Sequence, residues 1–291
     1  MQYIGLVGFR FVVFLFRLMP FSLLFVLANA VSFILHKVIG YRLKVVKENL
    51  NKSFPALNET ELEKLIKAFY RHLADILLEG IKGYSLSEKE LRKRFVYKNP
   101  EMLDEAFPSG KHIMLMPAHY GNWEWAVLSL PLPLKHQVIG VYKPLRAQLI
   151  EAFVGIRRSR FGLILNPISK TREAMNNPPN IPTAYIMMSD QNPSSRKKAQ
   201  WVKFLGRDTA CLHGADHYAR KFDYPVYYMH IHRVKRGFYE AEFSPIELNA
   251  ANTERAEITE KYMSVLEEKI LERPSDWLWS HKRWKYGRDL K

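Results

Sequence analysis

The sequence is poor in cysteine, and Cys211 is the single one among 291 residues. One thiol cannot build an intrachain disulfide framework, so the chain works in a reducing compartment or is indifferent to redox state. No activating sequence context surrounds Cys211. We therefore expect it to be a small core residue and not a catalytic thiol.

Acidic side chains are also scarce. The chain carries 29 Asp and Glu against 44 Lys and Arg, which gives a net charge of +15. Such an excess points to anionic partners: nucleic acid, an anionic membrane surface, an acidic protein or a phosphorylated ligand. A generally basic, solvated surface gives the same count, so charge alone does not choose among these partners.

Charge is absent altogether from residues 18–35, LMPFSLLFVLANAVSFIL. A membrane span needs about 20 mostly apolar residues. The ANA at 28–30 resembles a signal-peptide cleavage site, but the apolar run continues past it through Leu35, which is longer than a usual signal core. We therefore interpret residues 1–36 as a retained membrane anchor.

Basic residues flank this anchor on both sides. Those that follow it favour the cytoplasmic side of the membrane, and they are Lys37, Arg42, Lys44 and Lys47. Arg10 and Arg17 lie on the other flank and fit better if the helix lies shallow in one leaflet, with its arginines at headgroup level. The sequence leaves spanning and shallow arrangements open.

The pattern divides the chain into an anchor over 1–40 and one α/β catalytic domain over 41–291. Residues 41–58 look like a basic connector, after which Asn58 and Glu61 have capping-box spacing at the start of an amphipathic helix. Strands are expected at 112–118, 136–142, 183–189, 201–205, 225–231 and 238–243, and helices at 85–94, 122–130, 146–159, 169–176, 212–222 and 253–273. Such alternation predicts a mostly parallel or mixed sheet flanked by helices.

The stretch PAHYGNWEW at 117–125 places polar groups where a predicted strand ends. After His119, Gly121 permits a sharp turn, Asn122 can cap the next helix, and Glu124 falls in that helix's first turn. A carboxylate beside an imidazole fixes its tautomer and stabilises the imidazolium, which suits general-base activation of a hydroxyl or amine. Taken alone, His-x4-Glu is usually an ordinary loop-end histidine followed by a helix N-terminal charge.

Further segments change that weighting. His119 to Glu124 matches a His-x4-Asp/Glu signature with an embedded Gly-Asn-Trp-Glu. Other matching pieces follow in order: YRLKVVKENLNKSFP (41–55), RRSRFG (157–162), SDQNPS (189–194), KFLG (203–206) and WLWSHKRWK (277–285). Over essentially its whole length the sequence resembles the lysophospholipid-acyltransferase-like superfamily, and within it the bacterial late acyltransferases of lipid A biosynthesis. It departs from that family at Leu205, where a second Phe is frequent, and at Lys143, where Arg is common.

The resemblance implies a glycerol-phosphate-acyltransferase-like fold and acyl transfer without a covalent enzyme intermediate. In this scheme His119 deprotonates an acceptor hydroxyl, and Glu124 orients the imidazole and balances its charge. The oxygen attacks the thioester of an acyl donor, usually acyl carrier protein. Backbone N–H groups around Gly121 and Asn122 are candidates for stabilising the oxyanion.

The resemblance also implies a phosphorylated lipid A precursor as acceptor and a place at the bacterial inner membrane, with the catalytic domain on the cytoplasmic face. No metal or other cofactor is expected. A merely structural role is the alternative for each of the following groups. Arg158 and Arg160 are expected to bind the acceptor phosphate, because guanidinium groups grip phosphate with two hydrogen bonds. Asp190 and Gln191 are expected to order the site, with a plain turn as the alternative.

A basic run at 191–207 can dock acidic carrier protein or anionic headgroups, and it contains Arg196, Lys197, Lys198, Lys203 and Arg207. The tryptophans Trp277, Trp279 and Trp284 fit either a membrane interface or the core. His213 and His217 have a metal-ligand spacing without a third ligand, and we favour a structural role for them.

Other functions stay open at this point. Within the acyltransferase class, the acceptor can instead be an aminolipid or a lysophospholipid, because selectivity depends on pocket shape. Nucleic-acid binding is disfavoured by the apolar N-terminus and by the lack of a nucleic-acid-binding motif. A catalytically idle membrane scaffold is the third alternative.

Overall fold

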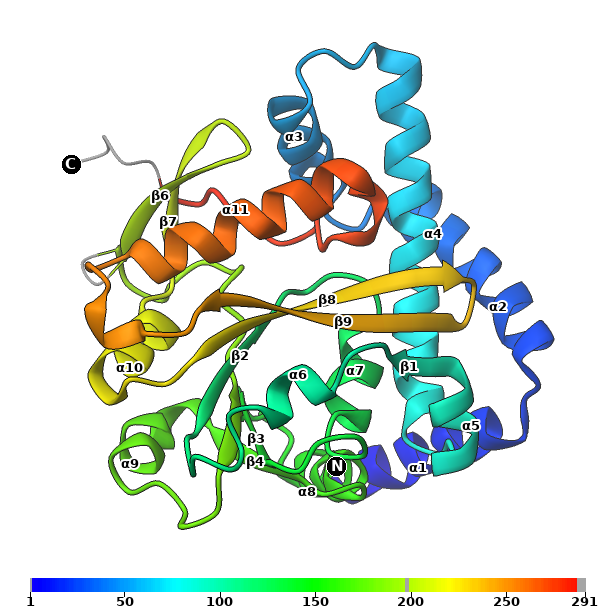
Figure 1. Cartoon of the computed structure of the whole chain (residues 1–291). Coiled ribbons are helices and arrows are strands. Elements are labelled where there is room, and N and C mark those ends of the chain that lie inside the picture. The colour runs from blue at the N-terminus through cyan, green and yellow to red at the C-terminus, as the bar shows by residue number, and fades with distance from the viewer. Residues whose placement is uncertain (1, 197–198, 287–291) are drawn as a thin grey trace.

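A mixed sheet of seven strands forms the centre of the computed structural model, which describes residues 2–196 and 199–286 (Figure 1). The sheet curves into a half-barrel with the strand order β1-β9-β8-β2-β5-β3-β4. Its strands are β1 (Phe95–Tyr97), β2 (Ile113–Pro117), β3 (Gln137–Tyr142), β4 (Leu163–Pro167), β5 (Thr183–Ile186), β8 (Val226–Lys235) and β9 (Phe238–Glu247). All neighbouring pairs are parallel except the β8–β9 hairpin. The predicted mixed α/β architecture is confirmed.

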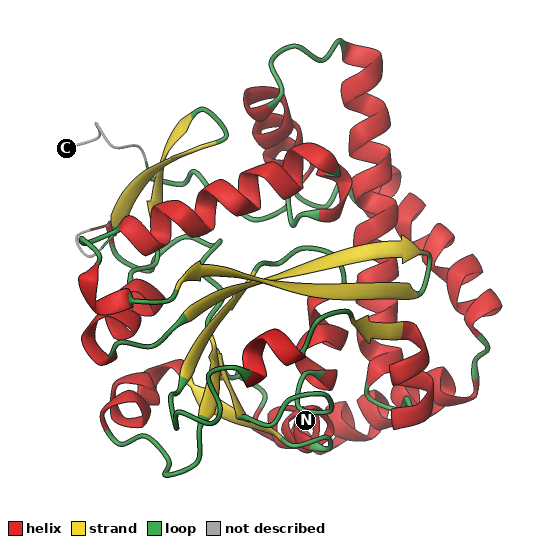
Figure 2. Ribbon diagram, in the orientation of Figure 1, coloured by secondary structure: helices red, strands yellow, loops and turns green. Residues whose placement is uncertain are grey.

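Helices cover both faces of this sheet (Figure 2). They are α1 (Gln2–Leu18), α2 (Phe21–Phe33), α3 (Leu43–Ser53), α4 (Glu59–Gly83), α5 (Glu88–Arg94), α6 (Glu101–Asp104), α7 (Trp123–Ser129), α8 (Gln148–Ser159), α9 (Thr171–Asn176), α10 (Gly214–Phe222) and α11 (Glu257–Glu272). A short π-helical turn, Ile34–Val38, follows α2. The capping box predicted at Asn58 is present at the start of α4.

The central strand β2 explains why its sequence is a solid apolar run. All five of its residues are buried. Met114 and Met116 belong to the core cluster shared with α11, whereas Ile113 and Leu115 belong to the cluster shared with α7. A strand covered on both faces needs apolar side chains at every position, not at alternate ones.

The structure differs from the sequence prediction in several elements. Residues 201–205 do form a strand, β6 (Gln200–Phe204), but it pairs with β7 (Arg207–Cys211) in a separate antiparallel hairpin. Strands β1, β4 and β7 were not predicted. β1 is short, β4 is largely half-exposed and β7 is largely polar, so none of the three has a clear apolar pattern. The expected connector at 41–58 contains helix α3.

The segment predicted to be a membrane anchor consists of two helices with a corner between them. Pro20 precedes α2, where its fixed φ suits a helix start. Buried Lys82 of α4 donates to the carbonyl oxygens of Phe16, Arg17 and Met19, at 2.7, 3.0 and 2.8 Å, and so holds this corner against the body. α2 packs along α4 through buried Leu24 and Ala28.

Much of the apolar surface of the anchor faces outward. The 18-residue stretch Phe21–Val38 is long and apolar enough to cross a membrane, and only 17% of it is buried. On α1, Ile4, Val7 and Phe11 are 77%, 67% and 59% exposed. A core helix of a soluble domain would bury such residues.

Candidate functional site

The turn after β2 places His119 at the carboxyl edge of the sheet. Gly121 has a φ of +59°, and a Cβ at this position would lie 2.7 Å from Cγ2 of Ile231 on β8. Only glycine therefore permits both the left-handed backbone and this close approach. The Gly121 N–H donates to the carbonyl oxygen of Asp276 at 3.0 Å, and the Leu278 N–H donates to that of His119 at 3.1 Å. The C-terminal segment thus braces the turn.

The hydrogen-bond partner of the His119 ring is Asp190, not Glu124. Asp190 follows β5, the strand beside β2, and its Oδ1 lies 2.8 Å from His119 Nδ1. Its Oδ2 accepts from the His119 backbone N–H at 2.9 Å and from Trp277 Nε1 at 3.0 Å. Asp190 was expected to order the site. It holds the histidine itself.

The electrostatics of this pair favour an ionised Asp190 beside a basic imidazole. Burial alone would raise the pKa of Asp190, but the His119 interactions outweigh burial and lower the pKa to about 2. Burial would lower the pKa of His119, yet the Asp190 carboxylate, with a smaller contribution from Glu124, raises it above its ordinary value. The His119 side chain is 21% exposed, so its ring remains accessible.

The carboxylate of Glu124 is bound by Arg158 of α8. Arg158 Nη2 donates to both carboxylate oxygens, at 3.0 and 2.8 Å. Glu124 was expected to orient His119, but the residue placed to orient the His119 ring is Asp190. Because Glu124 sits in the first turn of α7, its side chain reaches toward α8, while its charge still acts on His119.

The second predicted arginine, Arg160, is committed to the backbone. Its Nη2 donates to the carbonyl oxygens of Gly83 and Leu86, at 2.7 and 3.0 Å, and its Nη1 donates to that of Arg157. Arg160 thus ties the end of α8 to the loop after α4. In this structure neither Arg158 nor Arg160 has a guanidinium group free of protein partners, and the phosphate contact stays a prediction.

Of the two backbone N–H groups expected to stabilise an oxyanion, that of Gly121 is occupied, and the role of the Asn122 N–H stays a prediction. The Gly121 N–H is used by Asp276. Asn122 is fully buried, and its Oδ1 caps α7 by accepting from the Trp125 N–H at 3.0 Å. Its Nδ2 donates to Glu79 Oε2 at 2.7 Å. Asn122 therefore supports the turn from behind, and its side chain does not face a substrate.

Buried polar groups of α4 and β9, which the sequence analysis did not single out, lie under the turn. Glu79 Oε2 also accepts from the hydroxyl of Tyr239 at 2.7 Å, and the Glu79 carbonyl accepts from Trp125 Nε1 at 2.8 Å. Burial raises the pKa of Glu79 to about 7. A lone Glu on the apolar face of a predicted helix was the one available signal.

The C-terminal tryptophans belong to the core. Trp277 and Trp279 are buried, and their rings meet edge to face with centroids 4.7 Å apart. Trp284 is partly buried against Phe204. A membrane-interface role, one of the two alternatives for these residues, therefore does not apply to Trp277 and Trp279.

Among the described residues, the others singled out in the sequence lie in positions that do not indicate a function. Gln191 is half-buried next to Asp190. Lys203 pairs with Asp208 at 3.1 Å, and Arg207 stacks over the Trp284 ring at 4.0 Å. Lys197 and Lys198 lie outside the described residues. His213 and His217 have ring centroids 6.5 Å apart, and residues 2–196 and 199–286 contain no cluster of three or more His, Cys, Asp or Glu suited to a metal ion.

Comparison of the chain with known proteins identifies its family. The family described as bacterial lipid A biosynthesis acyltransferase matches residues 2–286. The chain is also similar to a lipid A biosynthesis acyltransferase of Haemophilus influenzae (strain ATCC 51907 / DSM 11121 / KW20 / Rd), with 30% identity over 166 residues. That match covers 55% of this chain and 50% of the Haemophilus protein, so the chain is aligned with about half the length of that relative. On the family match across nearly its whole length, the chain belongs to the bacterial lipid A biosynthesis acyltransferase family.

Proposed function

We propose that this protein transfers a fatty acyl group from an acyl carrier protein thioester to a hydroxyl of a phosphorylated lipid A precursor, with His119 as the general base. The observation that carries the proposal is the His119–Asp190 pair at the carboxyl edge of β2 and β5. Ligands of open α/β sheets bind at this edge. Family membership supplies the acyl-transfer chemistry and the lipid A acceptor.

The ring nitrogens of His119 have different roles in the proposed reaction. Asp190 holds the Nδ1 proton, so Nε2 carries the free lone pair. Nε2 takes the proton of the acceptor hydroxyl as its oxygen attacks the thioester carbonyl carbon. The tetrahedral intermediate collapses, the carbon–sulfur bond breaks, and the thiolate takes the proton back from the imidazolium. The products are the new ester and the free thiol of the carrier.

Glu124 and Arg158 are proposed to act beside this centre. Glu124 adds negative charge that favours the imidazolium formed during proton transfer, since its carboxylate raises the His119 pKa. Arg158 holds Glu124 in place and presents a guanidinium at the rim, where an acceptor phosphate can exchange with the carboxylate. Arg160, bound to backbone carbonyls, is not part of this proposal.

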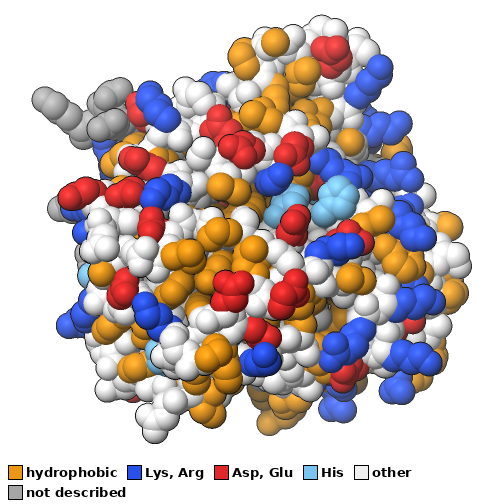
Figure 3. Space-filling view, in the orientation of Figure 1, with side chains coloured by type: hydrophobic (Ala, Val, Ile, Leu, Met, Phe, Trp, Pro, Cys, Tyr) orange, Lys and Arg blue, Asp and Glu red, His pale blue; other side chains and the backbone are white. Residues whose placement is uncertain are grey.

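We place the protein at the bacterial inner membrane with its catalytic domain on the cytoplasmic face. The exposed apolar residues of α1 and α2 support membrane attachment. Lys and Arg side chains gather along the right side of the face in Figure 3, over α2, α4 and the β8–β9 turn. Arg236 of that turn stacks over Phe25 of α2 at 4.6 Å, so basic and apolar groups adjoin, as anionic lipid headgroups require.

The direct test is His119→Ala, assayed with acyl carrier protein thioester and lipid A precursor in mixed micelles. Loss of the general base is expected to lower turnover by about 10²–10⁴-fold in protein that circular dichroism shows to be folded. His232→Ala, an exposed histidine of β8, is the matched control. Full activity of His119→Ala would remove this residue from the mechanism. Mass spectrometry of lipids from a deletion strain should show lipid A lighter by one secondary acyl chain, and an unchanged lipid A would argue for another acceptor.

A further inference from the structure

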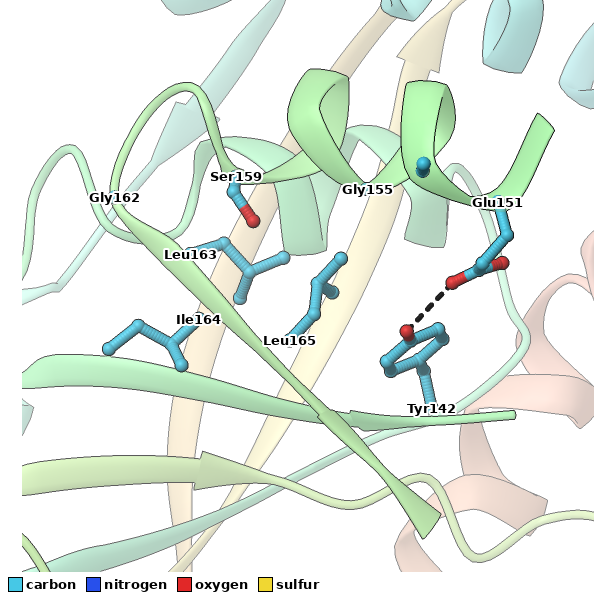
Figure 4. Close-up of a pocket in the computed structure, with 9 residues that line it drawn as sticks. Tyr142, Glu151, Gly155, Ser159, Gly162, Leu163, Ile164 and Leu165 are labelled. Carbon is cyan, nitrogen blue, oxygen red and sulfur yellow. Dashed lines mark hydrogen bonds between the residues drawn. The ribbon is translucent and has the colours of Figure 1, made fainter. Parts of the chain in front are cut away.

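A groove between helix α8 and the edge strand β4 has no role in the reaction described so far. It encloses about 600 Å³, within the range of about 300–1,000 Å³ typical of small-molecule sites (Figure 4). Leu163 and Leu165 of β4 line its floor, and Gly155 and Ser159 of α8 line its roof. Tyr142 and Glu151 lie at one end, joined by a hydrogen bond of 2.7 Å. The groove thus has a polar end and an apolar body.

The polar end of the groove adjoins the catalytic turn. Tyr142 is the last residue of β3, so it lies at the same carboxyl edge of the sheet as His119 and Asp190. Burial alone would lower the pKa of Arg158, but the nearby carboxylates of Glu124 and Glu151 outweigh burial and raise it. Arg158 donates to Glu124 at 3.0 and 2.8 Å, and the charge of Glu151 also acts on it, so the polar end of the groove is linked electrostatically to Glu124.

Spacing along α8 carries this continuity into the apolar body. Gly155, Arg158 and Ser159 follow Glu151 by four, seven and eight residues, so all four lie on one helix face. A Cβ at Gly155 would make van der Waals contact with Cδ1 of Leu165 at 3.8 Å, so a longer side chain here would enter the space between α8 and β4 that the glycine leaves unfilled. Glycine inside a helix costs about 1 kcal/mol relative to alanine, and this open space is what the glycine provides.

A different face of α8 contacts the membrane anchor. The rings of Phe9 on α1 and Phe153 on α8 meet edge to face with centroids 5.9 Å apart. The exposed apolar side of α1 therefore flanks the same helix that roofs the groove.

We infer that this groove holds the fatty acyl chain of the donor, with the thioester at the Tyr142–Glu151 end and the tail running along Leu165 and Leu163 past Gly155. The inference rests on the proposed acyl transfer and adds where the chain lies and what limits its length. The groove is formed by residues of the α/β domain at the carboxyl edge where the thioester must meet His119. Gly155 is thus the residue that sets the preferred chain length.

The test is competition between acyl carrier protein donors of graded chain length, with one fixed acceptor and the full chain in mixed micelles. Products are quantified by mass spectrometry for wild type, Gly155→Ala and Gly155→Leu. Each methylene group displaced from an apolar site lowers the relative use of that donor about fourfold. Gly155→Leu should therefore lower the ratio of long-chain to short-chain product by at least about tenfold. Gly155→Ala should shift the ratio in the same direction by less.

Folding and general effects are controlled within the same experiment. Alanine at 155 favours the helix, so a changed ratio in that variant does not arise from unfolding. Gly8→Leu introduces the same side chain at a helical glycine with open space around it, and it should leave the chain-length ratio unchanged.

The outcomes separate this inference from the proposed function. If Gly155→Leu transfers acyl chains at the wild-type rate and with the wild-type ratio of long to short chains, the groove assignment is wrong and the proposed function still stands. No transfer by the wild-type protein from any donor overturns the proposed function itself.

Discussion

At the scale of single residues, the site depends on which carboxylate holds the imidazole. Asp190 accepts from the His119 ring, from the His119 backbone N–H and from Trp277 Nε1, so three donors fix one buried carboxylate. A buried acceptor with this many donors cannot rotate away, and the tautomer of His119 is thereby fixed. Glu124, five residues from His119, acts through charge.

Asp190→Asn tests this assignment. The amide cannot accept from all three donors, and it places its own N–H₂ against a donor, so the tautomer with a free Nε2 lone pair is lost. Turnover should fall by about 10³–10⁴-fold. The pH profile should move as well. Neutral His119 is the active form, so wild-type activity should rise with pH through a midpoint above 6.5, and without the Asp190 charge that midpoint should fall.

Glu124→Gln is the matched comparison. It should lower the midpoint less than Asp190→Asn, because Glu124 contributes less to the raised pKa of His119. Equal shifts in the two variants would contradict the view that Asp190 is the principal partner. Circular dichroism at each pH would separate these effects from unfolding.

At the scale of elements, α8 and its C-cap residue Arg160 join three functions. Arg158 holds Glu124, Arg160 ties the helix end to the loop after α4, and Gly155 opens the groove. Two arginines that look equivalent in RRSR thus have different environments. Their substitutions should separate stability from activity.

Arg160→Ala should mainly lower stability, since it strands the carbonyl oxygens of Gly83 and Leu86. The expected cost is about 1–3 kcal/mol, measured as a lower urea midpoint. Arg158→Ala should cost about 0–1 kcal/mol, because its ion pair is partly exposed, but it should raise the acceptor KM by about tenfold and leave the donor KM nearly unchanged. Equal KM changes for both substrates would argue against a phosphate contact.

Elements also show what local sequence can and cannot predict. Helix α4 and strand β2 were predictable because capping and burial leave local patterns. Asp190 lies 71 residues from His119, and the β2–β5 pairing that joins them leaves no trace in spacing. The Glu124 side chain was misjudged because the first turn of α7 directs it toward α8. The burial of Trp277 and Trp279 depends on tertiary packing, which cannot be predicted from the local pattern of WLWSHKRW.

At the scale of the whole molecule, the arrangement of α1 and α2 favours attachment to one leaflet. α2 packs lengthwise against α4, a helix of the catalytic body, and Lys82 holds the corner before α2. A bilayer-spanning α2 would have to leave this contact. The exposed side chains of α1 are therefore expected to enter the membrane surface together with those of α2.

Phe11→Asp combined with Phe14→Asp tests this attachment. Burial of each ring contributes about 1.5–3 kcal/mol, so partition to vesicles with anionic lipids should fall by at least about 100-fold. Leu248→Asp, an exposed leucine at the end of β9, should bind like wild type. High-salt washing should leave the wild-type protein in the pellet. Retention of the double variant on vesicles would show that α1 lies outside the membrane surface.

The bonds between residues 119–121 and 276–278 have a consequence for the order of events during synthesis. Helices α1 and α2 leave the ribosome well before Trp277, which holds Asp190. If the protein acts as proposed, a nascent chain can therefore meet the lipid surface before its imidazole is locked, and we expect it to stay inactive until Trp277 has folded into place.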